Sequence, residues 1–166
     1  HLLQKLANHY GCPITSVDEV DFLPSQGDGA TLCHNDQVSP CRLVTPSLSL
    51  AFALQLTPEM AETLTRCERV CFVDAHTGAY PEEIRLAPLS PGYQAAPFTH
   101  HLTPESCLAL AYTLYGRVPE AALLSIRGYH FGYSTELSGQ TAALLDPALG
   151  QIIDWLGQGN MPAQTP

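Results

Sequence analysis

A chain of 166 residues with 45% hydrophobic composition can bury one sizeable core, whereas two domains of about 80 residues would each be marginal. Its 16 acidic residues outnumber its 7 Lys and Arg residues, and the formal net charge of -9 argues against nucleic acid or an anionic membrane surface as a partner. No apolar run reaches the roughly 18 residues that cross a bilayer. We therefore expect a single domain over residues 1–157 that has no contact with membranes.

The N-terminal part of the chain combines one periodic segment with a long irregular one. Apolar residues recur at helical spacing from Leu2 until Gly11 and Pro13 stop the pattern, which predicts a helix over residues 2–10. Residues 13–46 are rich in Asp, Ser, Gly, Asn and Pro and show no sustained periodicity. We expect an irregular insertion there.

After Pro46, short apolar runs alternate with helical segments, the order expected of a parallel sheet covered by helices on both faces. Thr57-Pro58 and Thr103-Pro104 each open a helix, because Thr can cap the free amides and Pro at the first helical position loses no hydrogen bond. We predict an α/β fold, a three-layer α/β/α sandwich with a mostly parallel central sheet. The predicted strands are residues 47–54, 69–75, 83–87 and 122–128, and the predicted helices are residues 57–66, 103–115 and 138–156.

Two features limit the last of these helices. Pro147 lies inside it and should kink or break it, because proline removes a hydrogen bond and clashes with the preceding turn. Residues 158–166 follow the last periodic segment, and we expect them to form a disordered tail.

The six cysteines leave two interpretations open. An even number suits three disulfides if a secretory signal preceded His1, whereas an apolar-rich chain of this length does not need such cross-links. Cys67 and Cys71 form a C-x3-C pair, which departs from the C-x2-C spacing of zinc sites, and no neighbour completes four ligands. Buried free thiols are the favoured interpretation.

Two potential metal ligands are predicted at the carboxyl edge of the sheet. Asp74 comes at the end of the strand over residues 69–75, and His100 comes shortly before the helix over residues 103–115. In open parallel sheets, ligands bind outside the carboxyl ends of the strands. A carboxylate and an imidazole can share a borderline divalent ion such as Zn or Ni, although two ligands alone bind it weakly.

Neighbouring residues provide alternatives to this pair. His101 could be the metal ligand in place of His100, and the register against the following helix favours His100. His76 could join a metal site, although a solvated loop histidine is more common. Gln55 lies at a strand-to-helix junction where it, like His101, could contact a substrate, whereas Glu59 is better explained as a favourable charge at a helix N-terminus.

Four segments stand in a characteristic order between about residues 47 and 156: QLTPEMAETL (55–64), VCFVDA (70–75), THHLTPESCLALA (99–111) and SIRGYHFGYSTELS (125–138). In order and spacing they resemble the nickel-iron hydrogenase maturation endopeptidases, specifically the branch that serves cytosolic hydrogenases. That family has a three-layer α/β/α fold and three nickel-facing ligands. Carried over by motif, the second ligand is Asp74 and the third is His100.

The first ligand of the family, an acidic residue in a glycine-rich loop after the first strand, has no counterpart in these 166 residues. In the family that loop directly precedes a helix like the one predicted over residues 2–10. We therefore expect the chain to begin just after the loop, without the first strand and the first ligand.

The resemblance implies an endopeptidase that removes a short C-terminal extension from the hydrogenase large-subunit precursor once nickel is installed. Nickel carried by the precursor would be the recognition element, and Asp74 and His100 would complete its coordination. A metal placed there could polarise the scissile carbonyl or lower the pKa of a bound water. The family lacks a Ser or Cys nucleophile, and we find no Ser-His-Asp arrangement in the sequence. We expect a cytoplasmic enzyme that acts as a monomer.

Two other functions stay open. The absence of the first ligand suggests a non-catalytic module that binds the tail of the large subunit. An unrelated α/β hydrolase or a flavodoxin-like ligand-binding domain would share only its layer architecture with the family.

Overall fold

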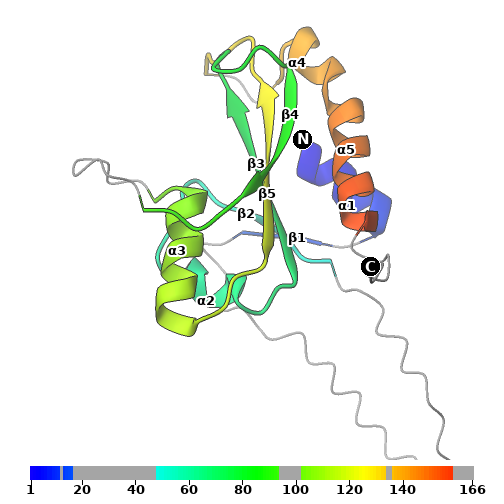
Figure 1. Cartoon of the computed structure of the whole chain (residues 1–166). Helices are drawn as coiled ribbons and strands as arrows, with labels where there is room; N and C mark the ends of the chain where they lie inside the picture. Colours follow the sequence, from blue (N-terminus) through cyan, green and yellow to red (C-terminus); the bar gives the residue numbers. More distant parts are fainter. Residues whose placement is uncertain (12, 17–47, 94–101, 134–135, 159–166) are drawn as a thin grey trace, which may run out of the picture. The chain divides into compact units, whose positions relative to one another are not determined.

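The computed structural model describes a mixed α/β chain (Figure 1). It divides into two compact units, residues 3–53 and residues 54–166 together with the first two residues, and each unit is described by itself. In the described part, no helix is long and apolar enough to cross a membrane. A single domain over residues 1–157 stays a prediction. The structure describes residues 1–11, 13–16, 48–93, 102–133 and 136–158.

The first helix, α1 (Leu2–Tyr10), confirms the helix predicted from apolar spacing. Leu2, Leu6 and Ala7 are buried, so the i, i+4 stripe that predicted the helix is also the face that it buries. Gly11 follows the last helical residue with a φ of 67°, a left-handed conformation that glycine adopts without a steric penalty.

The other described elements of the smaller unit are two short parallel strands. β1 (Ile14–Ser16) pairs with β2 (Leu50–Phe52), and Ile14 lies opposite Leu50. The strand predicted over residues 47–54 is therefore confirmed only in its centre. Residues 17–47, which make up most of the predicted insertion, lie outside the described residues.

The larger unit is organised around a mixed sheet of three strands in the order β3-β5-β4. β3 (Arg69–His76) and β5 (Glu120–Arg127) are parallel, whereas β4 (Ile84–Leu89) runs antiparallel to β5. Only residues 77–83 join β3 to β4, and a parallel return needs a crossover of a dozen or more residues. This short connection explains why the described sheet is mixed and not mostly parallel as predicted.

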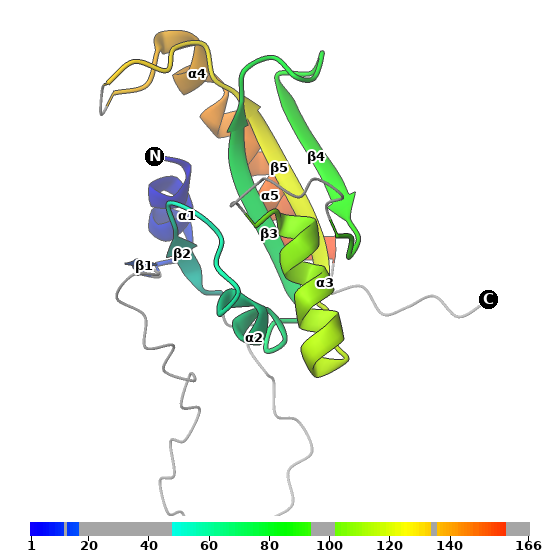
Figure 2. The same cartoon turned by 90° about the vertical axis from the view of Figure 1, so that its left-hand side faces the viewer.

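Helices α2 (Met60–Leu64) and α3 (Pro104–Tyr115) pack on one face of the sheet. Their buried contacts form one hydrophobic core cluster of this unit, and Figure 2 shows α3 in front of β3 and β5 with α5 behind them. The packing explains the apolar run from Val70 to Val73 in β3, because its side chains alternate between two covered faces. The core consists of Leu64, Cys107, Leu108 and Ala121, with Met60, Val70, Phe72, Leu89, Leu102 and Val118 packed against it.

The predicted cap of α3 is confirmed, whereas the cap predicted for α2 is not. Thr103 accepts a hydrogen bond from the Ser106 N–H at 3.3 Å, and Pro104 is the first helical residue. At α2 the helix begins later, because Thr57 closes a preceding turn by accepting from the Met60 N–H at 3.1 Å. Glu59 occupies the cap position, and hydrogen bonds from its own backbone N–H and from the Thr57 side chain lower its pKa. This agrees with a structural role for Glu59.

The C-terminal helical segment is broken, as predicted, but three residues before the proline. α4 (Gly139–Ala143) ends at Leu144, and α5 (Leu145–Gln158) begins immediately afterwards. Pro147 is the third residue of α5, where a missing N–H costs nothing because the first amides of a helix have no intrahelical acceptor. Residues 159–166, most of the predicted tail, lie outside the described residues.

Arg69 fastens the end of α5 to the opposite face of the sheet. Its Nη1 donates to the carbonyl oxygens of Trp155 and Leu156, the second at 3.2 Å. Its Nη2 pairs with Glu120 at 2.7 Å, and the guanidinium lies 3.9 Å from the centroid of the Trp155 ring. Only 15% of the Arg69 side chain is exposed, so this ion pair is worth more than a fully solvated one.

Shortening Leu108 should destabilise the larger unit strongly. Leu108 is 1% exposed in the core, and Leu108→Ala leaves a cavity that we expect to lower the free energy of unfolding by about 2–5 kcal/mol. Leu114→Ala in the same helix is the matched control, because Leu114 is 60% exposed and its loss should change stability by less than about 0.5 kcal/mol. Urea unfolding of both variants measures the difference, and equal effects would contradict the assigned core.

Candidate functional site

Asp74 lies near the carboxyl end of β3, as predicted, and the structure shows that it is exposed. One carboxylate oxygen accepts from the Ala75 N–H at 2.8 Å, which leaves the other oxygen open to a ligand. Strand alternation places Asp74 on the sheet face of Val70 and Phe72, beyond the part that α2 and α3 cover. A ligand that binds at this edge of the sheet could therefore contact Asp74 directly.

The register of the sheet extends a polar row from Asp74 across all three strands. Ser125 of β5 is the partner of Asp74, and Arg85 of β4 is the partner of Ser125. Paired residues of neighbouring strands point to the same face of a sheet. A carboxylate, a hydroxyl and a guanidinium thus share one face, and Ser125 in the middle is buried.

The next row contains His76, which is buried and not the solvated loop histidine that we expected. His76 is the last residue of β3, is 7% exposed and lies opposite Arg127. The Gly78 N–H donates to its Nδ1 at 3.2 Å, which requires the ring to be neutral with its proton on Nε2. Nε2 is buried and has no hydrogen-bond partner. Leaving such a donor unsatisfied costs about 1–3 kcal/mol, so a group that accepts from it would be favoured there.

Two arginines of this edge contact aromatic rings. The Arg85 guanidinium lies 4.5 Å from the centroid of the Tyr80 ring, and that of Arg127 lies 5.0 Å from the centroid of the Tyr129 ring. Gly78 packs beside the Arg127 side chain, and its φ of 100° is a conformation that favours glycine. Tyr80 also meets His76 edge to face, with centroids 5.3 Å apart.

Glu83, the residue just before β4, binds Tyr129 and not an arginine side chain. The Tyr129 hydroxyl donates to Glu83, and this hydrogen bond is the main reason that the pKa of Tyr129 is raised. The backbone of Glu83 accepts from the Arg127 N–H at 2.7 Å. Among the described residues, Arg85 and Arg127 have no carboxylate partner, whereas Arg66 and Arg69 each have one.

Of the other predicted site residues, the structure describes Gln55 but neither His100 nor His101. His100 and His101 lie outside the described residues, so their convergence with Asp74 stays a prediction. Gln55 is exposed, next to Leu56, and Leu56 forms an antiparallel bridge with Leu102. Because Leu102 follows His101 directly in the chain, the bridge ties the segment of Gln55 to the residue after the predicted ligands.

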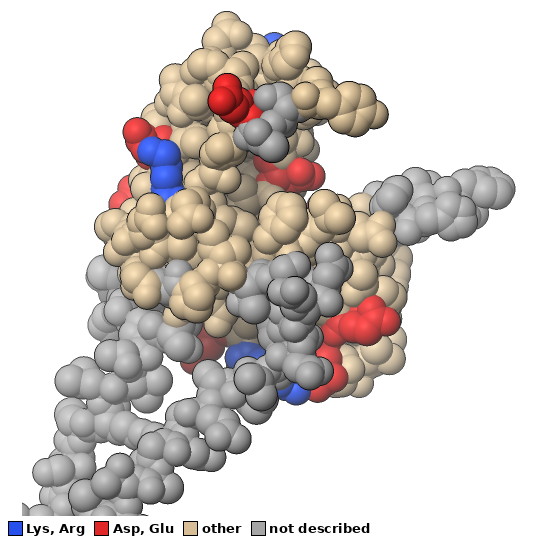
Figure 3. Space-filling view, turned by 180° about the vertical axis from the view of Figure 1, so that it is seen from behind, with Lys and Arg blue, Asp and Glu red and all other residues tan. Residues whose placement is uncertain are grey.

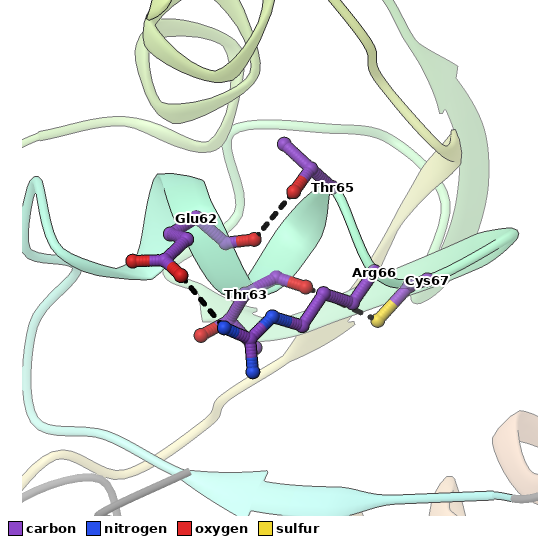
Figure 4. Close-up of polar contacts among 5 residues, drawn as sticks. All are labelled: Glu62, Thr63, Thr65, Arg66 and Cys67. Atoms are coloured by element: carbon purple, nitrogen blue, oxygen red, sulfur yellow. Dashed lines mark hydrogen bonds and ion pairs between the residues drawn. The ribbon is translucent and has the colours of Figure 1, made fainter. Parts of the chain in front are cut away.

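No group of three or more His, Cys, Asp and Glu side chains that could hold a metal ion occurs among residues that the structure describes. The described cysteines, Cys67, Cys71 and Cys107, are free thiols, in line with the favoured interpretation. Cys67 donates to the carbonyl oxygen of Thr63 at 3.6 Å (Figure 4). It thus belongs to the end of α2, where Arg66 also pairs with Glu62 at 2.6 Å.

One signal in the sequence could have placed His76 beside Asp74 at the carboxyl edge of the sheet. Asp74 and His76 stand two residues apart in one strand, and this period of two places both on the same face. The arginines could not be found in that way, because their proximity depends on the antiparallel pairing of β4 with β5.

The comparisons with known proteins find no matching family model, no matching curated protein and no matching solved structure.

The thiols of Cys71 and Cys107 should react slowly in the folded protein. Burial raises the pKa of each from 9.0 to about 11, so at pH 8 the reactive thiolate should be about a hundredfold scarcer than in the unfolded chain. Alkylation with iodoacetamide, followed by mass spectrometry with and without urea, measures this. Equal rates in the two conditions would show that these thiols are not buried.

The same shifts predict that stability falls at alkaline pH. The unfolded thiols ionise near pH 9.0 while the folded ones stay protonated up to about 11, so rising pH through that window favours the unfolded state. The urea midpoint should therefore decrease between pH 8 and pH 10. Cys71→Ala removes one of the two groups and should make the decrease smaller; an unchanged slope would contradict this explanation.

Proposed function

We propose that this chain is a metal-dependent maturation endopeptidase that removes a C-terminal extension from a nickel-loaded hydrogenase large-subunit precursor. The observation that carries the proposal is the exposed Asp74 at the carboxyl end of β3, with one carboxylate oxygen open to a ligand. This is the position at which the resembling family has its second nickel-facing ligand.

The surroundings of Asp74 are compatible with this role. A ligand of a substrate-borne ion must reach the ion from the protein surface, and Asp74 is exposed while the first half of β3 is covered. Its strand is held by parallel pairing with β5 along the full length of both strands. A carboxylate on such a paired strand is better positioned than one on a loop, which suits coordination geometry.

In the proposed reaction, Asp74 and His100 bind the nickel that the precursor carries and so align the scissile bond next to the ion. His101 is the alternative ligand, and Gln55, tied by the Leu56–Leu102 bridge to the start of α3, is the proposed contact for the substrate backbone. An ion beside the scissile bond polarises its carbonyl or lowers the pKa of a bound water. The proposal needs no Ser or Cys nucleophile.

The finer features of the fold and setting belong to the same proposal. The family's three-layer sandwich with a mostly parallel sheet would require strands in addition to the three described in the larger unit. A monomeric, cytoplasmic enzyme with the large-subunit precursor as its partner completes the proposed function.

Replacing the Asp74 carboxylate should abolish processing without unfolding the protein. Asp74→Asn keeps the shape of the side chain but removes the charge that binds nickel, and we expect cleavage of the nickel-loaded precursor to fall at least a hundredfold. The matched control is Asp154→Asn, because Asp154 is an exposed aspartate in α5 on the other face of the sheet. Gel analysis of the precursor with purified protein, including any residues encoded upstream of His1, measures the rates.

The nickel-free precursor provides the second arm of this experiment. It should not be cleaved by the unmodified protein, because the ion is the proposed recognition element. Equal cleavage of loaded and nickel-free precursor would contradict the mechanism. Binding of the loaded precursor without any cleavage would favour the alternative, a module that only binds the tail of the large subunit.

A further inference from the structure

We propose that Arg85 and Arg127 form a binding site for a carboxylate group of a peptide, at the same sheet edge as Asp74. The site itself is inferred from the described residues alone. Its use to hold the C-terminal extension of a precursor rests on the proposed function.

Strand register brings the two arginines together. Arg85 is the partner of Ser125, and Arg127 lies two residues further along β5, so both side chains project from the same face of adjacent strands. Diagonal neighbours of this kind are about 7–8 Å apart, a separation that two long side chains can bridge around one small anion. The site is therefore built from two paired strands.

Both guanidinium groups lie over aromatic rings and make no side-chain hydrogen bond among the described residues. Tyr80 and Tyr129 each meet one arginine through the ring face. A guanidinium that contacts a ring by its plane keeps its in-plane N–H donors free, and these donors match the two oxygens of a carboxylate. Ring contacts also restrict the side chains, so less freedom is lost when an anion binds.

His76 is a second, independent observation that points to a ligand. It lies opposite Arg127, it is nine-tenths buried, and its Nε2–H has no acceptor within the described structure. The imidazole is neutral, because Nδ1 already accepts from the Gly78 N–H.

The carboxylate nearest in sequence to Arg85 does not neutralise it. The sequence has 7 Lys and Arg residues against 16 Asp and Glu residues, yet Glu83, the carboxylate nearest in sequence to Arg85, accepts from Tyr129 instead. On the face drawn in Figure 3, most of the described surface belongs to uncharged residues, with acidic side chains scattered over it. Arg85 and Arg127 thus have no carboxylate partner among the described residues, although acidic residues outnumber basic ones in the chain.

A monoanion fits this edge better than a phosphate. Asp74 occupies the same row as Arg85, and the formal net charge of the chain is -9, so a second negative charge on the ligand would be repelled. The carboxylate of a peptide can come from an acidic side chain or from the C-terminus. Both sources have the same chemistry, and peptide probes can distinguish them.

Three N-acetylated peptides titrated against the full chain test the site: a tetra-alanine with a free C-terminal carboxylate, the same peptide as an amide, and the amide with one Ala replaced by Asp. We expect the arginine side-chain N–H signals in NMR spectra to shift saturably with at least one of the two carboxylate peptides and not with the neutral amide. The peptide that binds identifies the source of the carboxylate. Equal responses to all three peptides, or none, would overturn the proposal.

Substitutions connect the response to the named residues. Arg127→Gln and Arg85→Gln should each weaken binding at least tenfold, whereas Arg117→Gln, an exposed arginine outside this edge, should leave it unchanged. Arg127→Lys keeps the charge but loses the planar fork, and an intermediate affinity would separate recognition from simple attraction. If a glutamine variant fails to fold, the lysine variant still tests the site, and full affinity in the lysine variant would contradict bidentate recognition.

The experiment also separates this inference from the proposed function. Carboxylate binding by a protein that cleaves no nickel-loaded precursor would retain the site and reject the endopeptidase. The opposite result is loss of cleavage in Asp74→Asn with an unchanged KM for the precursor in Arg85→Gln and Arg127→Gln. That result would support the endopeptidase and show that the arginine site does not bind its substrate.

Discussion

The larger unit depends on the double pairing of β5. This strand hydrogen-bonds to β3 on one side and to β4 on the other, and most of its residues are buried. A strand in that position satisfies its backbone groups only if both neighbours keep their register, so β5 fixes the rows of side chains on both faces. The core beneath α3 and the attachment of α5 through Arg69 both follow from these rows.

The same register defines the candidate site. Asp74, Ser125 and Arg85 share a row because each is the partner of the next, and His76 with Arg127 forms the row beyond it. A slip of one residue in either pairing would turn half of these side chains to the other face. The edge therefore combines an exposed carboxylate with two guanidinium groups on one face of the sheet.

The chain matches no family model, curated protein or solved structure in the comparisons, so its own residues carry the functional proposal. The resemblance to maturation endopeptidases supplies an expectation for Asp74 and for His100, and the structure describes the first of these. What it adds is independent of any family: a buried His76 with an open donor and two arginines without carboxylate partners among the described residues.

The sequence by itself determined the elements that depend on local signals. Apolar spacing identified α1, a continuous β-branched run identified β3, and the Thr103-Pro104 cap identified the start of α3, because each is a property of neighbouring residues. The tertiary structure alone decided the antiparallel insertion of β4 beside β5, the burial of His76 and the approach of Arg85 to Tyr80. All three features depend on which strands pair. Pairing between distant segments is determined by how the whole unit packs its side chains, and no local sequence pattern encodes that packing.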